Sequence, residues 1–542
     1  MDHFELILFG ILVSVAALSV IARRINVPYP ILLVIGGLAL GFVPGMPDVE
    51  LDPDIVLVVF LPPLLYAAAF FSSLRDLRAN ARPITLLAVG LVLMTTVSVA
   101  VVAHAVIDGL PWAAAFALGA IVSPTDPVAA TTIIRRVGAP RRIATVLEGE
   151  SLVNDATALV AYRVAVAAAV GGTFSLADAS LEFVLGVIGG LAIGLAAGWI
   201  VEQVRRRIED PPVETTISLL TAYAAYIPAE EIGASGVLAA VTAGVYLGWR
   251  APRIASATTR MQSYAVWDIL TYLLNATLFV LVGLQLSIIV EPLSSSEVWT
   301  LTGYAAVVSG VVILTRLTWG FTVTYLVRAL DRRESQRERR TSWRLRLLSA
   351  WSGMRGAVSL AAALALPLST DAGDPFPQRD AIIFITFGVI FVTVVIQGLT
   401  LPLLIRVLDL HDDGADEQEE VRARIVAATA ALEEIDRLEG EDWTRDETIE
   451  RMRRMYEYRR RRFKIRAGKV EDDGTEDQSL AFQRSVQSVI AAQRRALVGL
   501  RNSGDIPDDV MRRVERELDL EESRLELDTM RDGLRGPVAD QQ

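Results

Sequence analysis

The chain has 542 residues, of which 52% are hydrophobic and 21% are charged, and this apolar share is too high for a soluble protein of this length. It contains no cysteine, which excludes disulfides, cysteine-ligated metals and thiol chemistry. The three histidines (His3, His104 and His411) lie far apart in the sequence, so a histidine-ligated metal site is not expected. The composition predicts an integral membrane protein that needs no cofactor.

Apolar stretches long enough to cross the ~30 Å core of a bilayer recur about thirteen times. Their approximate centres are Val13, Gly36, Leu61, Met94, Ala120, Leu159, Ile193, Ala222, Thr242, Phe279, Val312, Ala357 and Ile390. The first stretch, roughly Phe4 to Ala22, lacks a basic leader and a small-residue cleavage site, so we interpret it as a permanent span. The second, fifth and ninth are short or broken. We therefore expect an all-α membrane protein of about 13 transmembrane helices.

The charges between these stretches alternate along the chain. Alternate loops carry 23 arginines, eight of them between Arg328 and Arg346, whereas the opposite loops carry only Arg379. The arginine-rich side of a membrane protein faces the cytoplasm. The pattern predicts that the N-terminus is outside, that the C-terminus is in the cytoplasm, and that the number of spans is odd.

The chain changes character after Leu408. Residues 409–542 carry 34 acidic and 24 basic residues and are too polar to enter a membrane. Apolar spacing in this segment predicts helices near Glu417–Leu438, Asp446–Ile465, Gln478–Leu500 and Pro507–Leu534. We expect two domains, a transmembrane domain at 1–408 and a helical cytoplasmic domain at 409–542.

Two aspartates lie inside apolar stretches. Asp126 belongs to the run Ser123–Pro127, and Asp155 ends the run Gly149–Asp155. A carboxylate at bilayer depth costs at least ~2.5 kcal/mol, so it is rarely there without a function. Pro124 and Pro127 interrupt the helix around Asp126, and irregular backbone at this depth is tolerated only in protein or beside a wet cavity. The pattern predicts an ion-handling cavity inside the membrane.

The positions of these residues along their spans bring them to a similar depth. At 1.5 Å per residue, Asp155 lies about 18 Å from the cytoplasmic end of the sixth span, and Asp126 about 21 Å from the outer end of the fifth. Arg355, in the glycine-rich break of the twelfth span, is about 15 Å deep. The fifth and twelfth spans occupy the same position in two six-span units if the seventh is a linker. Interrupted helices at matching positions are typical of inverted repeats.

Several roles are open for the polar residues nearby. Asp155 either binds the ion or is a structural carboxylate, and we favour ion binding. Asp126, next to Thr125, either caps the broken helix or binds the ion directly. Ser151 shares a helix face with Asp155 because it lies four residues earlier, and Asn154 can bond to the broken backbone.

Other charged residues in the spans need partners. We interpret Glu150 and Arg355 as a buried ion pair that joins the sixth and twelfth spans, in preference to a gate. Arg163, near the outer end of the sixth span, can reach that surface. Arg316 lies too deep to do so, and the sequence identifies no partner for it.

Oxygen ligands without sulfur or imidazole suit an alkali cation. A single carboxylate that holds either this cation or a proton performs exchange directly, and no net charge moves when each carries one charge. The dipeptide Asn154-Asp155, in place of two adjacent acids, favours such electroneutral exchange.

Four segments resemble the NhaP/NHE sodium–proton antiporters, the electroneutral branch of the monovalent cation:proton antiporters. They are Phe60–Tyr66 (FLPPLLY), Ser123–Pro127 with Glu148–Asp155 (SPTDP and EGESLVND), Ala229–Ala239 (AEEIGASGVLA) and Gly353–Leu360 (GMRGAVSL). The resemblance implies a homodimer in the cell membrane in which a mobile core moves like an elevator. It implies exchange of sodium, with lithium or potassium as alternatives, for protons in pH and sodium homeostasis.

The same resemblance implies roles for single residues. Asp155 would be the exchange carboxylate, with Ser151, Asp126 and Thr125 in or near the ion shell. Asn154 would brace Thr125, and Glu150 would pair with Arg355. Many members carry an acid where this chain has Ala67, and this departure leaves the cation preference open.

Other classes of protein fit less well. A channel would show a repeated pore loop, and a transporter of anions would need Arg355 unpaired. A membrane enzyme would show a nucleophile, a base and metal ligands, and nothing indicates nucleic-acid binding. A sensor that signals through its tail is the remaining alternative, and transport by a chain cut near His411 would count against it.

Overall fold

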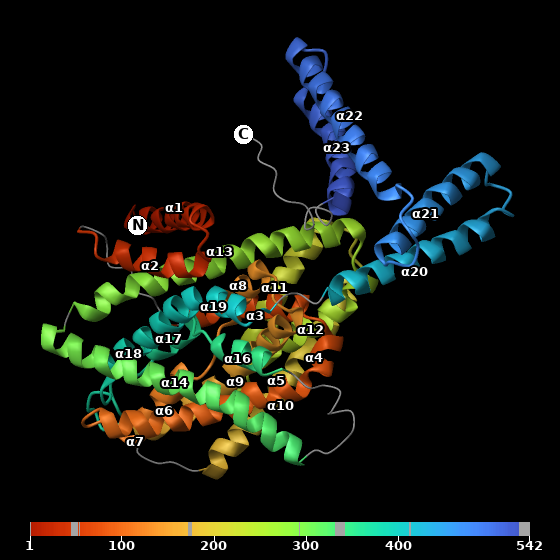
Figure 1. Cartoon of the computed structure of the whole chain (residues 1–542). Coiled ribbons are helices and arrows are strands. Elements are labelled where there is room, and N and C mark those ends of the chain that lie inside the picture. Colours follow the sequence, from red (N-terminus) through yellow and green to blue (C-terminus); the bar gives the residue numbers. More distant parts are fainter. Residues whose placement is uncertain are drawn as a thin grey trace. The chain divides into compact units, whose positions relative to one another are not determined.

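The computed structural model describes residues 2–44, 53, 55–171, 176–291, 293–330, 342–410 and 414–529. These residues form helices, and the one β-type pairing among them is an isolated bridge between Ser369 and Pro375. The chain divides into two compact units, Met1–Asp412 and Asp413–Gln542. Figure 1 shows the helices of both units, coloured along the sequence.

The first unit holds the apolar helices. Up to α9 these are α1 (Asp2–Arg24), α2 (Tyr29–Gly41), the π-helical turn η1 (Ile55–Phe60), α3 (Leu61–Phe71), α4 (Leu74–Ala79), α5 (Ala81–Thr85), η2 (Leu86–Leu91), α6 (Val92–Val106), α7 (Trp112–Val122), α8 (Pro127–Val137) and α9 (Arg141–Gly171). They are followed by α10 (Leu176–Arg205), α11 (Pro211–Glu231), α12 (Gly236–Ile254), α13 (Ala257–Val290), α14 (Ser295–Leu330), α16 (Trp343–Trp351), α17 (Ala357–Leu364), α18 (Arg379–Phe391), η3 (Val392–Gln397) and α19 (Gly398–Val407).

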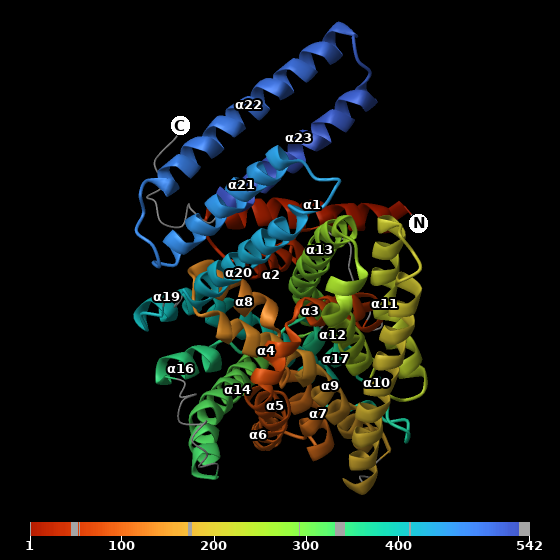
Figure 2. The same cartoon turned by 90° about the vertical axis from the view of Figure 1, so that its right-hand side faces the viewer.

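Each of the thirteen centres predicted from the sequence falls within one of these helices. Seven helical segments of the described residues are long and apolar enough to cross a membrane on their own, and α2 and η1–α3 are shorter apolar segments. Part of the predicted arginine-rich loop, residues 331–341, lies outside the described residues. Within the first unit, α10 to α12 pack together on one side and α14 with α16 lies on the other (Figure 2).

The core beside the interrupted helices is built around α2 and α13, which pack along each other. Glycines permit their close approach, because a Cβ on Gly37 would lie 3.1 Å from a backbone atom of Val280, and one on Gly283 2.6 Å from the amide nitrogen of Leu38. Small residues at such contacts are typical of helices in membranes, where packing rather than water exclusion holds helices together.

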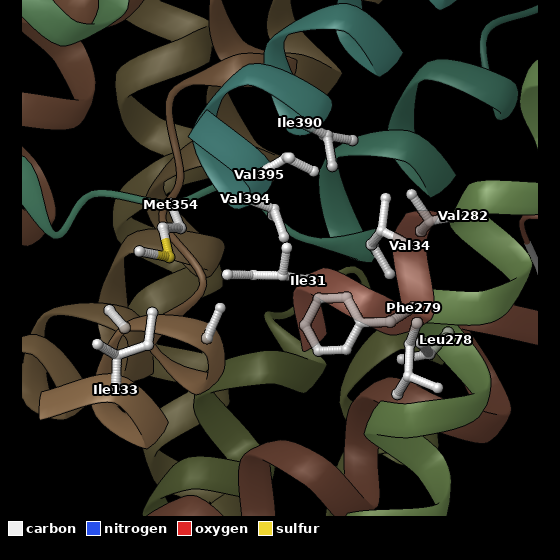
Figure 3. Packing of buried hydrophobic residues seen from close by; sticks show 14 of the residues in the cluster. Ile31, Val34, Ile133, Leu278, Phe279, Val282, Met354, Ile390, Val394 and Val395 are labelled. Carbon is white, nitrogen blue, oxygen red and sulfur yellow. The ribbon is translucent and has the colours of Figure 1, made fainter. Parts of the chain in front are cut away.

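Side chains from several other elements complete this core. Ile31 and Val34 of α2 and Phe279 of α13 meet Met354, which precedes α17, and Ile133 of α8 (Figure 3). The α2–α13 pair therefore supports both interrupted helices from one side.

The second unit contains polar helices. They are α20 (Ala415–Leu438), α21 (Asp446–Arg466), α22 (Thr475–Ser503) and α23 (Asp508–Thr529). α20 packs on α21 around Leu432, Ile435 and Ile449, and α22 packs on α23. The four predicted tail helices agree with these to within a few residues, and the predicted end of the last one at Leu534 lies outside the described residues.

Candidate functional site

Two unwound segments cross in the first unit. Residues 123–126 separate α7 from α8, and residues 352–356 separate α16 from α17. The backbone N–H of Asp126 donates to the carbonyl of Met354 at 2.8 Å and so joins the two segments. A Cβ at Gly356 would lie 2.7 Å from the Asp126 Cβ and 2.8 Å from its Cγ, so only glycine allows this close approach.

Asp126 is the N-cap of α8. Its Oδ1 accepts a hydrogen bond from the backbone N–H of Val128 at 2.9 Å, and Pro127 occupies the first turn of the helix, where its missing N–H costs nothing. The carboxylate also lines the cavity described next. The capping interpretation of Asp126 thus agrees with the observed hydrogen bond, whereas direct ion binding stays a prediction.

A cavity of about 100 Å³ lies beside this crossing. Asp155 and Ser151 of α9 line it together with Thr125 and Asp126 from the first break. The side chains of Asp155 and Ser151 are only 6% and 8% exposed. Within the described ranges the Asp155 carboxylate accepts no hydrogen bond and forms no ion pair. An unpaired carboxylate in a buried cavity large enough for water is free to hold a proton or a cation.

Asn154 holds the first break in place. Its Nδ2 donates to the carbonyl of Thr125 at 3.1 Å and to the Thr125 Oγ1 at 3.0 Å. The same hydroxyl donates to Oε1 of Glu150 at 2.9 Å. Two neighbouring turns of α9 therefore fix the orientation of Thr125. The contact of Asn154 with Thr125 was expected from the sequence, whereas the contact of Glu150 with Thr125 was not.

The ion pair predicted between Glu150 and Arg355 is wrong, because the structure gives Glu150 a different partner. Arg316 of α14 forms a bidentate pair with Glu150, with Nη1–Oε1 at 2.5 Å and Nη2–Oε2 at 2.8 Å. Both side chains are 2% exposed. The pair joins α14 to α9, and it supplies the partner of Arg316 that the sequence left unidentified.

Arg355 instead binds backbone carbonyls. Its Nε donates to the carbonyl of Val122 at 3.0 Å, and its Nη1 donates to the carbonyl of Gly353. Val122 is the last residue of α7, whose final carbonyls have no partner within the helix. A cation at the C-terminus of α7 and a carboxylate at the N-terminus of α8 each oppose the partial charge of a helix end. The prediction failed because depth along a span does not show which way a side chain points.

A second part of the cavity wall is formed by α3 and α13. It consists of Leu61, Leu64, Leu65 and Ala68 from α3 and of Asn275, Leu278 and Phe279 from α13. Ala67 is not on this wall but is buried among side chains of α11, α12 and α13. Asn275 was not expected from the sequence, although an asparagine inside an apolar stretch is a signal that could have indicated it.

Two polar residues near the outer ends of their spans have structural contacts. Arg163 of α9 is exposed, and it also pairs with Glu230 of α11. His104 of α6 contacts the carbonyl of Leu110 through Nδ1 at 2.7 Å and stacks on Trp112. Neither residue lines the cavity.

The fold and this site together define a class of protein. Crossed, interrupted helices surround a cavity that presents carboxylate and hydroxyl oxygens inside a bundle of apolar helices. Such ligands suit hard monovalent cations and protons. The first unit is a multi-pass membrane protein built to handle small cations.

Comparison with known proteins identifies the family. The family model described as the transmembrane sodium/hydrogen exchanger matches residues 10–407, and the chain belongs to this family. A Mycobacterium tuberculosis protein described as an uncharacterized Na+/H+ exchanger is 37% identical over 536 residues, which cover 96% of this chain and 97% of that one. A Bacillus subtilis sodium, potassium, lithium and rubidium/H+ antiporter is 36% identical over 418 residues, covering 74% of this chain and 62% of that one.

A solved structure resembles the first unit. The sodium proton antiporter MjNhaP1 from Methanocaldococcus jannaschii matches with a TM-score of 0.59 and 20% sequence identity, covering 75% of this chain and 99% of that one. At this identity the match shows the fold. The chain is therefore a multi-pass membrane transporter that performs monovalent cation/proton antiport, and it is not an enzyme. The resemblance seen in the sequence is confirmed at the level of the family.

Proposed function

We propose that the protein exchanges one monovalent cation, with sodium as the first candidate, for one proton at the carboxylate of Asp155. The observation that carries this proposal is the unpaired Asp155 carboxylate in the cavity between the crossed breaks. A proton bound on one side is displaced by the cation, and the cation is displaced by a proton on the other. Because the carboxylate carries one positive charge in each direction, the cycle is electroneutral.

The ligand set that we propose for the cation is Asp155, Ser151, Asp126 and Thr125, which line the same cavity. Asp126 also caps α8, so one of its oxygens is engaged while the other is available to an ion. These residues offer only oxygen, as an alkali cation requires.

The other residues of the site act as supports. Asn154 holds Thr125, and the pair of Glu150 with Arg316 anchors the same region of α9. Arg355 stabilises the carbonyl end of α7. None of these three contacts uses the carboxylate of Asp155, so the supports leave the exchange group free.

We also propose that access alternates by an elevator movement of α7, α8, α9, α16 and α17 against α3 and α13. The cavity supports this division, since one part of its lining comes from α8, α9, α17 and the two breaks and the other from α3 and α13. The matching breaks favour two inverted six-helix repeats, and the family resemblance favours a homodimer.

The orientation and the tail remain part of the proposal. The arginine distribution supports a cell-membrane protein with its N-terminus outside and its C-terminus in the cytoplasm. We assign exchange to residues 1–408 and a regulatory role to the cytoplasmic domain at 409–542. The physiological role would be pH and sodium homeostasis.

The test is proton flux from proteoliposomes on addition of sodium, potassium or lithium, with and without a clamped membrane potential. We expect cation-driven flux that is insensitive to the potential and absent in Asp155→Asn. Asp380→Asn is the matched control, because it removes a carboxylate whose side chain is 80% exposed and lies outside the cavity. Full activity in Asp155→Asn would refute the assignment, and voltage-sensitive flux would refute the stoichiometry.

A further inference from the structure

The part of the cavity wall that α3 and α13 form carries a polar group of its own. Six of the seven residues that α3 and α13 contribute to this wall are apolar, and the seventh is Asn275. Asn275 lies in the middle of α13, one turn before Leu278 and Phe279. Asn275 therefore lines the same cavity as Asp155 and Ser151, but from a different group of helices.

The hydrogen bonding of Asn275 leaves one atom available. Its Nδ2 donates to the carbonyl of Thr271, one turn earlier, at 2.8 Å. In the part of the chain that the structure describes, Oδ1 accepts no hydrogen bond. Polar groups at this depth rarely go without a partner, because an unmade hydrogen bond in an apolar setting costs ~1–3 kcal/mol. The side chain that carries this free acceptor lines a cavity that can hold water or an ion.

The helix that carries Asn275 is firmly held. α13 packs along α2 at the glycine contacts of Gly37 and Gly283. Asn275 is therefore part of the wall against which the aspartate-bearing helices would move. Asn275 lines the cavity from α13, while Asp155 lines it from α9 and Asp126 from the break before α8.

We propose that Asn275 is a specificity-determining residue for the transported cation, and this inference rests on the function proposed above. Its Oδ1 binds the cation, or a water of the cation's shell, while Asp155 balances the charge. An apolar wall offers nothing in place of the water that a cation sheds, and small cations hold this water most strongly. A neutral amide oxygen replaces part of that shell without adding a group that takes up protons, so one-for-one exchange is preserved.

The experiment compares Asn275→Leu, which removes the oxygen at similar size, with Asn275→Gln, which keeps an amide. Leu278→Ala is the control for a change in wall packing. The apparent KM for lithium, sodium and potassium, the maximal rate and the melting temperature are measured in the full-length protein. We expect Asn275→Leu to raise the KM for lithium and sodium by about tenfold or more relative to potassium, as for the loss of a hydrogen bond to a charged group. The maximal rate and melting temperature should stay close to wild type, and Asn275→Gln should recover part of the selectivity.

Unchanged KM values and ion preference in Asn275→Leu would overturn the inference, and so would a fall in maximal rate and melting temperature at constant KM. If Asn275→Leu does not reach the membrane, Asn275→Ala makes the same comparison. Loss of transport in Asp155→Asn beside an unchanged Asn275→Leu would refute only this inference. Transport in Asp155→Asn would refute the proposed function itself.

Discussion

The buried pair of Glu150 with Arg316 allows a quantitative test of the structure. Replacing Arg316 with methionine leaves Glu150 in the protein interior, with the hydroxyl of Thr125 as its one remaining partner among the described residues. Removing one member of a buried ion pair costs about 3–5 kcal/mol, because the remaining charge is uncompensated. We expect Arg316→Met and Glu150→Gln each to lower the melting temperature of the purified protein strongly.

The double variant tests the pairing itself. Arg316→Met combined with Glu150→Gln removes both charged groups together. The loss of stability in this double variant should therefore be smaller than the sum of the losses in the two single variants, with a coupling free energy of about 0.5–3 kcal/mol. The matched control is the cycle of Glu150→Gln with Arg355→Met, for which we expect weaker coupling, since Arg355 donates to carbonyls and Glu150 pairs with Arg316. The melting temperatures of all five variants, measured in one detergent, give both cycles. Strong coupling to Arg355 and none to Arg316 would refute the observed arrangement.

Three further substitutions test other contacts. Gly356→Ala should abolish transport and lower the free energy of unfolding by about 1–3 kcal/mol, because the added carbon overlaps Asp126. Wild-type flux in this variant would contradict the close approach of the two breaks. Asn154→Ala removes two hydrogen bonds to Thr125 in the first break, so it should destabilise the protein by about 1–3 kcal/mol and raise the KM for sodium. An unchanged melting temperature would show that these two hydrogen bonds are dispensable. Arg163→Gln should change stability by less than about 1 kcal/mol, since the side chains of Arg163 and Glu230 are 42% and 27% exposed, and a large drop in melting temperature would contradict this.

The interrupted helices were predictable from sequence because the signals are local. Pro124 and Pro127 each remove a backbone donor, and the glycines around Arg355 permit an unwound chain. The tail helices were equally accessible, since apolar spacing and glycine breaks mark their ends. The period of a helix also placed Ser151 and Asp155 on one face, and both line the cavity.

What sequence could not provide is the direction of side chains across the bundle. The sequence suggested Arg355 as the partner of Glu150 because both are charged residues inside spans, but the partner is Arg316 of α14, which lies 166 residues away in the chain. In the same way, many family members carry an acidic residue at the position of Ala67, so this position was expected to matter for ion binding. In the structure the neighbouring Ala68 is the residue that lines the cavity. The partner of Glu150 and the residue of α3 that lines the cavity both depend on how a helix is rotated about its own axis. An apolar stretch without periodicity does not indicate this rotation in its sequence.

The most direct test of a shared carboxylate is the dependence of the sodium KM on pH. If sodium and protons compete for Asp155, acidification should raise the apparent KM for sodium by up to about tenfold per pH unit, as mass action requires. The maximal rate at saturating sodium should then change little over the pH range in which the KM rises. A KM that stays constant while the maximal rate falls on acidification would show that protons act at a separate group, and this result would contradict exchange at one carboxylate.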